Sequence, residues 1–104
     1  MKRKQRHPVF VCRCGLNGLA LIRELGRRGV PVYALDSVRS VGTFSRHAAF
    51  LSCPDPLSRE QELIGFLREC APRFPLRPVL LPTDDAWALA LARHRDVLAG
   101  DYIL

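Results

Sequence analysis

The sequence predicts an α/β fold in which about five mostly parallel strands carry helices on both faces, as a three-layer sandwich. Short apolar runs rich in Val, Leu and Phe alternate with helical patterns along the chain. Each apolar run is nearly continuous, which is typical of strands that are buried on both faces. The 104 residues, 48% of them apolar, suffice for one domain and leave no room for a second, catalytic one.

The pattern of the first 36 residues predicts a βαβ unit. A first strand is expected at Pro8–Cys12, bounded by Pro and by the glycine loop. Helical periodicity follows over Leu16–Arg28, with Asn17 or Gly18 as the N-cap. The second strand is expected at Pro31–Asp36, and such a unit has a right-handed crossover in nearly all known cases.

The middle of the chain is less regular. A loop with at most a short helical turn is expected over Ser37–Ala48, before a third strand at Ala49–Cys53. The next helix is predicted to start in a capping box in which Ser58 and Gln61 satisfy each other's backbone N–H groups. Prolines, the first of them Pro72, end this helix.

The last third contains another strand and helix. A fourth strand is expected at Pro78–Pro82, followed by Thr83 as the N-cap of a helix that runs to about Ala99. Gly100 stops this helix. Asp101–Leu104 then predicts the beginning of a fifth strand.

The net charge of +6 is concentrated at one end, where Lys2, Arg3, Lys4 and Arg6 precede any apolar pattern. Residues 1–7 are therefore interpreted as a basic disordered tail, and residues 8–104 as the folded domain. No aromatic side chain lies among these charges and no recognition-helix pattern follows them, which argues against nucleic-acid binding.

The sequence carries no signal-peptide pattern and no apolar run near the roughly 18–20 residues that span a bilayer. We therefore expect no membrane partner and a cytoplasmic location. Without a secretory signal, the four cysteines are interpreted as buried, reduced thiols rather than disulfides. Cys12 and Cys14 lack the C-x-x-C spacing of zinc and redox sites, so no metal is expected.

Candidate binding residues follow the predicted strands, because ligands of open parallel sheets collect at the carboxyl ends of the strands. The loop after the first strand contains Gly15, Leu16, Asn17 and Gly18, whose backbone N–H groups at a helix start suit a phosphate or carboxylate. This loop keeps the second and third glycines of the dinucleotide pattern G-x-G-x-x-G and lacks the first. Asp36 lies 18 residues beyond Gly18, close to where an acidic residue would bind a ribose hydroxyl.

Each of the other candidates has two interpretations. Asp36 serves either as a ligand or as a turn residue that accepts nearby backbone N–H groups. Arg39 and Arg46 either grip an anion or are solvated loop residues. Thr83 and Asp84 form either a binding edge or simply the cap of the helix that follows. No residues form a nucleophile, base and orienting group at diagnostic spacing, so no catalytic residue is assigned.

Several segments together resemble the start of the ATP-grasp carboxylate–amine ligases. They are Gly18–Asp36 (GLALIRELGRRGVPVYALD), Ser45–His47 (SRH), Pro78–Trp87 (PVLLPTDDAW) and Ala92–Arg95 (ARHR). The match covers roughly residues 8–104 and rests on the order and spacing of the segments. The lead-in Cys12-Arg13-Cys14 departs from what the resemblance would suggest.

The resemblance implies that residues 8–104 are the N-terminal, pre-ATP-grasp domain of such a ligase, with a Rossmann-like fold. In that family this domain helps to bind a small carboxylate or amine substrate at its strand ends. ATP and magnesium are held by an ATP-grasp domain, which would act in cis or in trans. The resemblance thus implies a substrate-binding and docking domain that binds no cofactor and is inactive by itself.

Two alternatives remain open at this stage. The first is a nicotinamide-dinucleotide-binding module, which the missing first glycine disfavours. The second is an assembly module that binds a protein partner through an uncovered face, with a homodimer as one such assembly.

Overall fold

Four parallel strands form one sheet in the order β3-β2-β1-β4. The computed structural model describes residues 6–104. The strands are β1 (Val9–Cys12), β2 (Val32–Asp36), β3 (Ala49–Ser52) and β4 (Val79–Pro82). β1 lies in the centre, where Val9 pairs in parallel with Val32 on one side and with Val79 on the other. This order is that of the first four strands of the doubly wound sequence 3-2-1-4-5-6.

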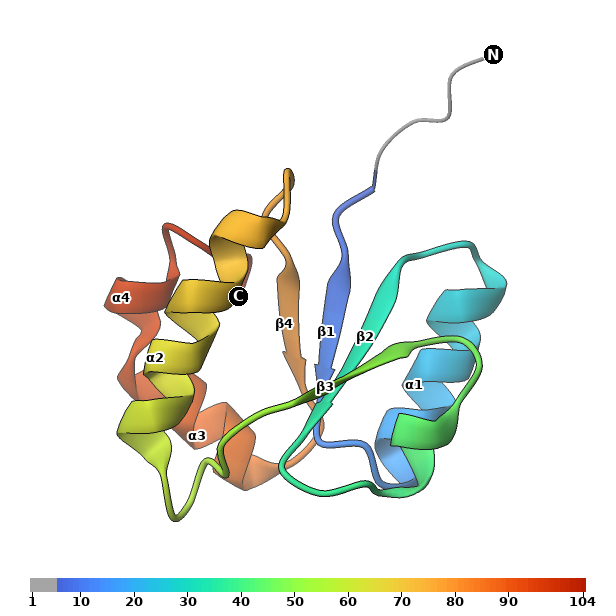
Figure 1. Ribbon diagram of the computed structural model, residues 1–104, viewed down its shortest axis with the longest axis horizontal. Helices are drawn as coiled ribbons and strands as arrows, with labels where there is room; N and C mark the ends of the chain where they lie inside the picture. The colour runs from blue at the N-terminus through green and yellow to red at the C-terminus, as the bar shows by residue number, and fades with distance from the viewer. Residues whose placement is uncertain (1–5) are drawn as a thin grey trace.

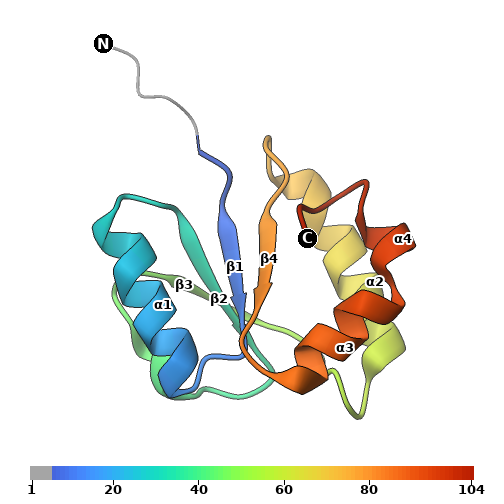
Figure 2. The same ribbon diagram turned by 180° about the vertical axis from the view of Figure 1, so that it is seen from behind.

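Helices cover both faces of the sheet, as Figure 1 and, from behind, Figure 2 show. α1 (Leu16–Arg27) packs on one face, and α2 (Glu60–Cys70), α3 (Asp85–Arg93) and α4 (Arg95–Leu98) lie on the other. Two short 3₁₀ turns, η1 (Val41–Phe44) and η2 (Ala71–Arg73), follow β2 and α2. Among residues 6–104, no helix has the length and apolar character needed to cross a membrane.

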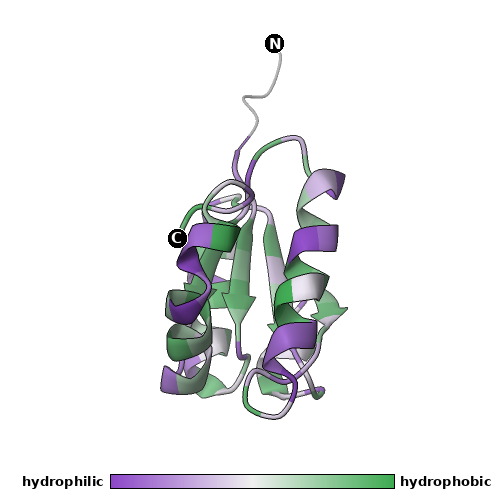
Figure 3. Cartoon of the chain, turned by 90° about the vertical axis from the view of Figure 1, so that its left-hand side faces the viewer, coloured by the Kyte–Doolittle hydropathy of each residue, from purple (hydrophilic) through white to green (hydrophobic). Residues whose placement is uncertain are grey.

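The strands divide the hydrophobic core into two layers, because successive side chains of a strand point to opposite faces. On β1, Val9 and Val11 pack with Ile22 of α1, whereas Phe10 and Cys12 pack with the helices of the other face. Figure 3 shows strands that are mainly hydrophobic and helices in which hydrophilic and hydrophobic segments alternate. This pattern is expected of helices that bury one side only.

Phe10 is the centre of an aromatic cluster on the face of α2 to α4. Its ring meets Tyr33, Phe74 and Tyr102 edge to face, with centroids 5.6, 5.3 and 5.7 Å away. The buried hydroxyl of Tyr102 donates a hydrogen bond to the carbonyl of Leu67, 2.5 Å away. The cluster therefore attaches the end of the chain to β1 and α2.

The expected fifth strand is reduced to a single bridge, so the prediction of about five strands was wrong by one within the described residues. Of the segment Asp101–Leu104, only Ile103 pairs with β4: its N–H donates to the carbonyl of Pro78, and its carbonyl accepts from the N–H of Leu80. The preceding residue, Tyr102, is not available for pairing, because its N–H bonds Leu98 in a turn. Ile103 lies on the edge of β4 that faces away from β1.

The capping box predicted at Ser58 does not form. The carboxylate of Asp55 accepts hydrogen bonds from the N–H groups of Leu57 and Ser58, 2.9 and 3.0 Å away. These bonds hold the chain in a turn, so α2 begins only at Glu60 and has no side-chain cap. A turn closed by Asp55 thus stands where the Ser58–Gln61 capping box was expected.

The helix predicted to run to Ala99 is interrupted at His94, where the backbone leaves helical geometry (φ −113°) and separates α3 from α4. The His94 side chain Nε2 lies 2.8 Å from the Glu60 carboxylate, which also pairs with Arg93. Glu60 is the first residue of α2. Its carboxylate therefore joins α2 to the break between α3 and α4.

The basic residues Lys2, Arg3 and Lys4 lie outside the described residues. Of the remaining tail, Arg6 donates a hydrogen bond to the carbonyl of Arg28, 2.6 Å away. His7 donates through Nδ1 to the carbonyl of Arg77, 2.8 Å away. These two bonds connect the described part of the tail to opposite sides of β1.

The contacts of Glu60 predict an acid-sensitive contribution to stability. Hydrogen bonds from Arg93, and secondly from His94, lower the pKa of Glu60 from 4.5 to about 2. Because the folded-state pKa is depressed, the contribution is complete above about pH 4.5 and is lost as the pH falls toward 2. We expect the wild-type protein to lose stability relative to Glu60→Gln over this interval. Urea unfolding of both proteins at pH 6, 4, 3 and 2 measures the difference, and a constant difference would contradict the expectation.

Candidate functional site

The carboxyl ends of β1, β2 and β4 bring most of the predicted site residues to one edge of the sheet. The loop Gly15–Gly18 follows β1, Asp36 ends β2, and Thr83 and Asp84 follow β4. β1 connects to β2 on one side, whereas its other neighbour, β4, is reached only after β3 and α2. The chain thus leaves β1 and β4 toward opposite sides of the sheet. This place is the topological switch point, where open parallel sheets bind ligands.

Arg13, the first residue after β1, has an unusual backbone conformation. Its φ of 79° lies in the left-handed region, where a residue with a Cβ costs about 1–2 kcal/mol. Arg13 occupies the place of the missing first glycine in the pattern G-x-G-x-x-G. The chain therefore makes the tight turn that this glycine would allow, with a long cationic side chain at the same position.

The turn after β1 leads directly into α1. Gly15 is the N-cap, so the prediction of Asn17 or Gly18 in that role was wrong. A glycine has no side chain that could bond the first N–H groups of the helix, and no other side chain of residues 6–104 caps them. Leu16 is the first helical residue, and its side chain is 78% exposed. The start of α1 therefore presents uncapped backbone donors at the switch point.

Gly18 has a different task from Gly15. A Cβ at Gly18 would lie only 2.4 Å from the carbonyl oxygen of Arg13, whereas a Cβ at Gly15 would meet nothing within 4 Å. Glycine at position 18 thus lets α1 approach the left-handed turn closely. The space beside Gly15 stays open.

Asp36 is a structural residue rather than an exposed ligand group. Its side chain is 1% exposed, and Oδ2 accepts from the N–H of Cys14 and the hydroxyl of Ser40, 2.9 and 2.7 Å away. Oδ1 accepts from the N–H of Ser37, 2.8 Å away, and lies 3.7 Å from a guanidinium nitrogen of Arg13. The carboxylate therefore acts as a turn residue, the second of the two interpretations. It also joins the turn after β2 to the turn after β1.

Thr83 and Asp84 lie at the same edge of the sheet, in the loop after β4. The hydroxyl of Thr83 donates to the carbonyl of Arg13, 2.8 Å away, so Thr83 is not the N-cap that we expected. Asp84 is the N-cap of α3, and its Oδ1 accepts from the N–H of Trp87, 2.9 Å away. Oδ2 of Asp84 pairs with Nε of Arg13 at 3.1 Å. The Arg13–Asp84 pair thus joins the loops that follow the neighbouring strands β1 and β4, and it remains partly exposed to solvent.

Arg39 does not reach this edge. Its guanidinium lies over the rings of Phe44 and Phe50, 4.2 and 4.4 Å from the ring centroids, and donates to the carbonyl of Thr43. These contacts hold η1 against β3, the edge strand. Its guanidinium thus contributes to packing at the edge strand, away from the other candidate residues.

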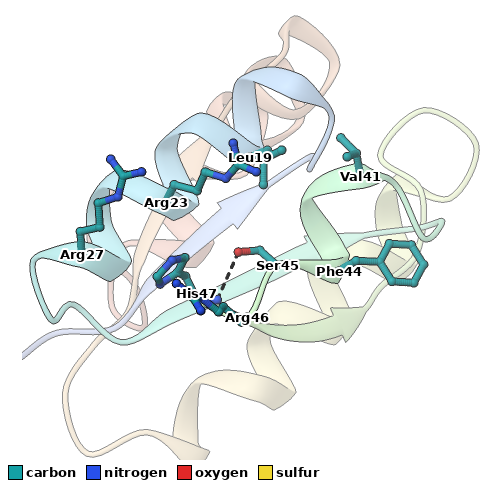
Figure 4. Close-up of a pocket in the computed structure, with 8 residues that line it drawn as sticks. All are labelled: Leu19, Arg23, Arg27, Val41, Phe44, Ser45, Arg46 and His47. Carbon is teal, nitrogen blue, oxygen red and sulfur yellow. Dashed lines mark hydrogen bonds between the residues drawn. The ribbon is translucent and has the colours of Figure 1, made fainter.

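Arg46 is also separate from the switch point. It lies with Ser45 and His47 in a groove between α1 and the segment that leads into β3, as Figure 4 shows. The groove has a volume of about 670 Å³. The prediction had grouped Arg46 with the strand-end loops, whereas the structure places it along the flank of α1.

The cysteines are buried and unreactive in their surroundings. Burial, followed by the negative charge of Asp36, raises the pKa of Cys14 and of Cys53 to about 12. Burial also raises the pKa of Cys12. A thiol with such a pKa remains protonated at neutral pH and is a poor nucleophile. Within residues 6–104, no group of three or more His, Cys, Asp and Glu side chains is placed to hold a metal ion.

Together these residues form an edge suited to binding rather than to covalent chemistry. It offers uncapped N–H groups at the start of α1, a guanidinium at Arg13 and a carboxylate at Asp84. Sequence reasoning named the loop and Asp84 but missed Arg13. Its position in the sequence could have predicted this role, because Arg13 replaces the first glycine of the pattern G-x-G-x-x-G.

The buried carboxylate of Asp36 predicts a large loss of stability when its charge is removed. In Asp36→Asn, an amide NH₂ would face backbone N–H donors that the carboxylate now satisfies. We expect a loss of about 2–3 kcal/mol, measured by urea unfolding. Asp101→Asn is the matched control, because Asp101 makes no side-chain hydrogen bond within the described residues, and its effect should stay within about 0.5 kcal/mol. Equal effects of the two substitutions would contradict this role of Asp36.

The left-handed turn at Arg13 predicts a difference between two variants that both lack the guanidinium. Arg13→Gly relieves the strain of the positive φ, whereas Arg13→Ala keeps it. Both lose the pair with Asp84, so the comparison isolates the backbone. The Gly variant should be more stable than the Ala variant by about 1 kcal/mol in urea unfolding. Equal stability would show that the turn does not require the left-handed conformation.

Comparisons with known proteins add no identification to this geometry. No family model matches the chain, and no curated protein matches it. The case for a function therefore rests on the residues of this chain and on their arrangement at the sheet edge.

Proposed function

We propose that the chain is the substrate-binding domain of an ATP-dependent carboxylate–amine ligase of the ATP-grasp type. One observation carries this proposal: the uncapped start of α1 lies at the switch point of a parallel sheet, beside the exposed Arg13–Asp84 pair. The resemblance of the segments Gly18–Asp36 and Pro78–Trp87 to that family supports it. Both segments border this edge.

The proposed substrate is a small molecule that bears a carboxylate, an amine or both. Its carboxylate would accept hydrogen bonds from the N–H groups of Leu16 and Asn17, which the positive end of the α1 dipole strengthens. An ammonium group would be attracted to the carboxylate of Asp84, which is partly exposed. The protein groups that would bind the carboxylate and the ammonium of the substrate thus lie on two adjacent loops. The hydrogen bond from Thr83 to the carbonyl of Arg13 joins these loops.

A nicotinamide-dinucleotide site is less well supported by the same residues. Both oxygens of Asp36, the residue in position to bind a ribose, already accept hydrogen bonds from protein donors. Arg13 also adds a long side chain at the position of the first glycine of the pattern, beside the turn that would face the pyrophosphate. These features favour a smaller ligand than a dinucleotide.

The chemical step belongs to another domain in this proposal. In the family that the chain resembles, ATP and magnesium are held by the ATP-grasp domain, and we propose the same division here. The part of this chain is to bind and orient the substrate at the strand ends. By itself it should form no ADP from ATP, with or without an amine or carboxylate acceptor.

A substitution that removes one backbone donor and keeps the helix tests the site. Leu16→Pro deletes the N–H of the first helical residue, where proline is well tolerated. Gly15 has an extended ψ of −156°, outside the α region that a following proline disfavours. Leu16→Ala is the matched control, because it removes the exposed side chain and keeps the N–H.

The measurement is a titration of the ¹⁵N-labelled chain with each common amino acid, with acetate, with succinate and with NAD. We expect at least one of the small probes to shift the amide signals of Gly15, Asn17 and Gly18. The Leu16→Pro variant should bind this probe about tenfold more weakly, the effect of one charge-assisted hydrogen bond, and Leu16→Ala should bind it like the wild type. Equal affinities of the two variants, the absence of any shift, or tighter binding of NAD would overturn the proposal.

A further inference from the structure

A second, strongly cationic groove lies on the flank of α1, away from the switch point. One wall is α1, which contributes Leu19, Arg23 and Arg27. The other wall is the segment from η1 to β3, which contributes Arg46 and His47 (Figure 4). The volume of about 670 Å³ falls within the range of roughly 300–1,000 Å³ that is usual for ligand sites.

The positive charge of this groove is not neutralised by the residues around it. Arg23, Arg27 and Arg46 are exposed, and none of the described residues that line the groove is acidic. Glu24, the one acidic residue of α1, pairs at 2.8 Å with Arg28, on the neighbouring stripe of the helix. Within residues 6–104, the three arginines of the groove make no salt bridge. An anion would therefore meet three guanidinium groups that have no competing carboxylate.

The spacing of the cations is set by the backbone. Arg23 and Arg27 are four residues apart on α1, so their side chains start about 6 Å from each other on one face. Opposite them, the ring of His47 packs against Gly26, where a Cβ would lie 2.5 Å from Cβ of His47. The N–H of His47 bonds Oγ of Ser45 at 3.1 Å, which shapes the turn that carries Arg46. Glycine at position 26 thus lets the second wall approach α1 closely.

We propose that this groove binds a small anion with at least two phosphate groups. A guanidinium holds phosphate with two parallel hydrogen bonds. Each phosphate group carries a charge of about −1.5 to −2 at neutral pH, so two of them balance three arginines. The apolar side chains of Leu19 and Val41 at the other end of the groove would contact the organic part of such a ligand.

This site differs from the substrate site of the proposed function. The groove is lined by none of the residues Gly15 to Gly18, Thr83 or Asp84. Leu16→Pro, which removes a donor at the switch point, should therefore leave phosphate binding in the groove unchanged. A loss of binding at one site, with the other retained, distinguishes failure of one proposal from failure of the other.

The test is calorimetric titration with pyrophosphate, tripolyphosphate and citrate, at low and at high salt. Arg23→Gln, Arg27→Gln and Arg46→Gln each remove one charge from the groove. Arg68→Gln is the matched control, because it removes the same charge from α2 on the opposite face of the sheet. We expect each groove variant to bind tripolyphosphate at least about fivefold more weakly, and Arg68→Gln to change the affinity by less than about twofold.

Four outcomes would overturn the proposal. Equal losses in the groove variants and in Arg68→Gln would show that net charge alone attracts the anion. Citrate binding as tight as tripolyphosphate binding would assign the groove to carboxylates. Tighter binding of an eight-nucleotide oligothymidylate, with amide shifts that extend beyond the groove, would assign it to a nucleic acid. Absence of any binding of tripolyphosphate at low salt would exclude a phosphate site altogether.

Discussion

The buried carboxylate of Asp36 is the constraint on which the rest of the site depends. An ionised group that is 1% exposed is tolerated only when donors replace the water that it has lost. The donors come from the turn after β1, at Cys14, and from the loop after β2, at Ser37 and Ser40. Satisfying one charge therefore positions both loops, and with them the start of α1 and the turn that leads to η1.

The second constraint is the left-handed turn at Arg13. Its carbonyl accepts the hydroxyl of Thr83 and lies too close to Gly18 to allow a Cβ there. The same residue pairs with Asp84 in the loop after β4. One strained residue thus connects the turn after β1 with the loop after β4, and strain of this kind persists only where the surrounding contacts hold it. A chain with glycine at this position would adopt the positive φ without strain, but it would lose the guanidinium at the proposed substrate site.

α1 connects the two proposed sites. Its first turn supplies uncapped N–H groups at the switch point, and its flank supplies Arg23 and Arg27 to the groove. Arg39 shapes the wall of the groove opposite α1, because its stacking on Phe44 and Phe50 holds η1 against the edge strand. The two sites use different residues of one helix, so that a small carboxylate or amine and a phosphorylated ligand would not compete for the same donors.

The sequence by itself determined the four strands, the βαβ unit at the start and the gathering of Gly15, Asp36 and Asp84 at one edge. These features depend on apolar runs and on strand direction, which are local properties of the chain. Only the tertiary structure decided which polar groups meet. A turn at Asp55 stands where the Ser58–Gln61 capping box was expected, a turn at Tyr102 leaves one bridge of the fifth strand, and Arg46 lies beside α1 instead of at the strand ends. Alternative hydrogen bonds compete for the same backbone groups, and packing between segments that are distant in sequence decides which of them form.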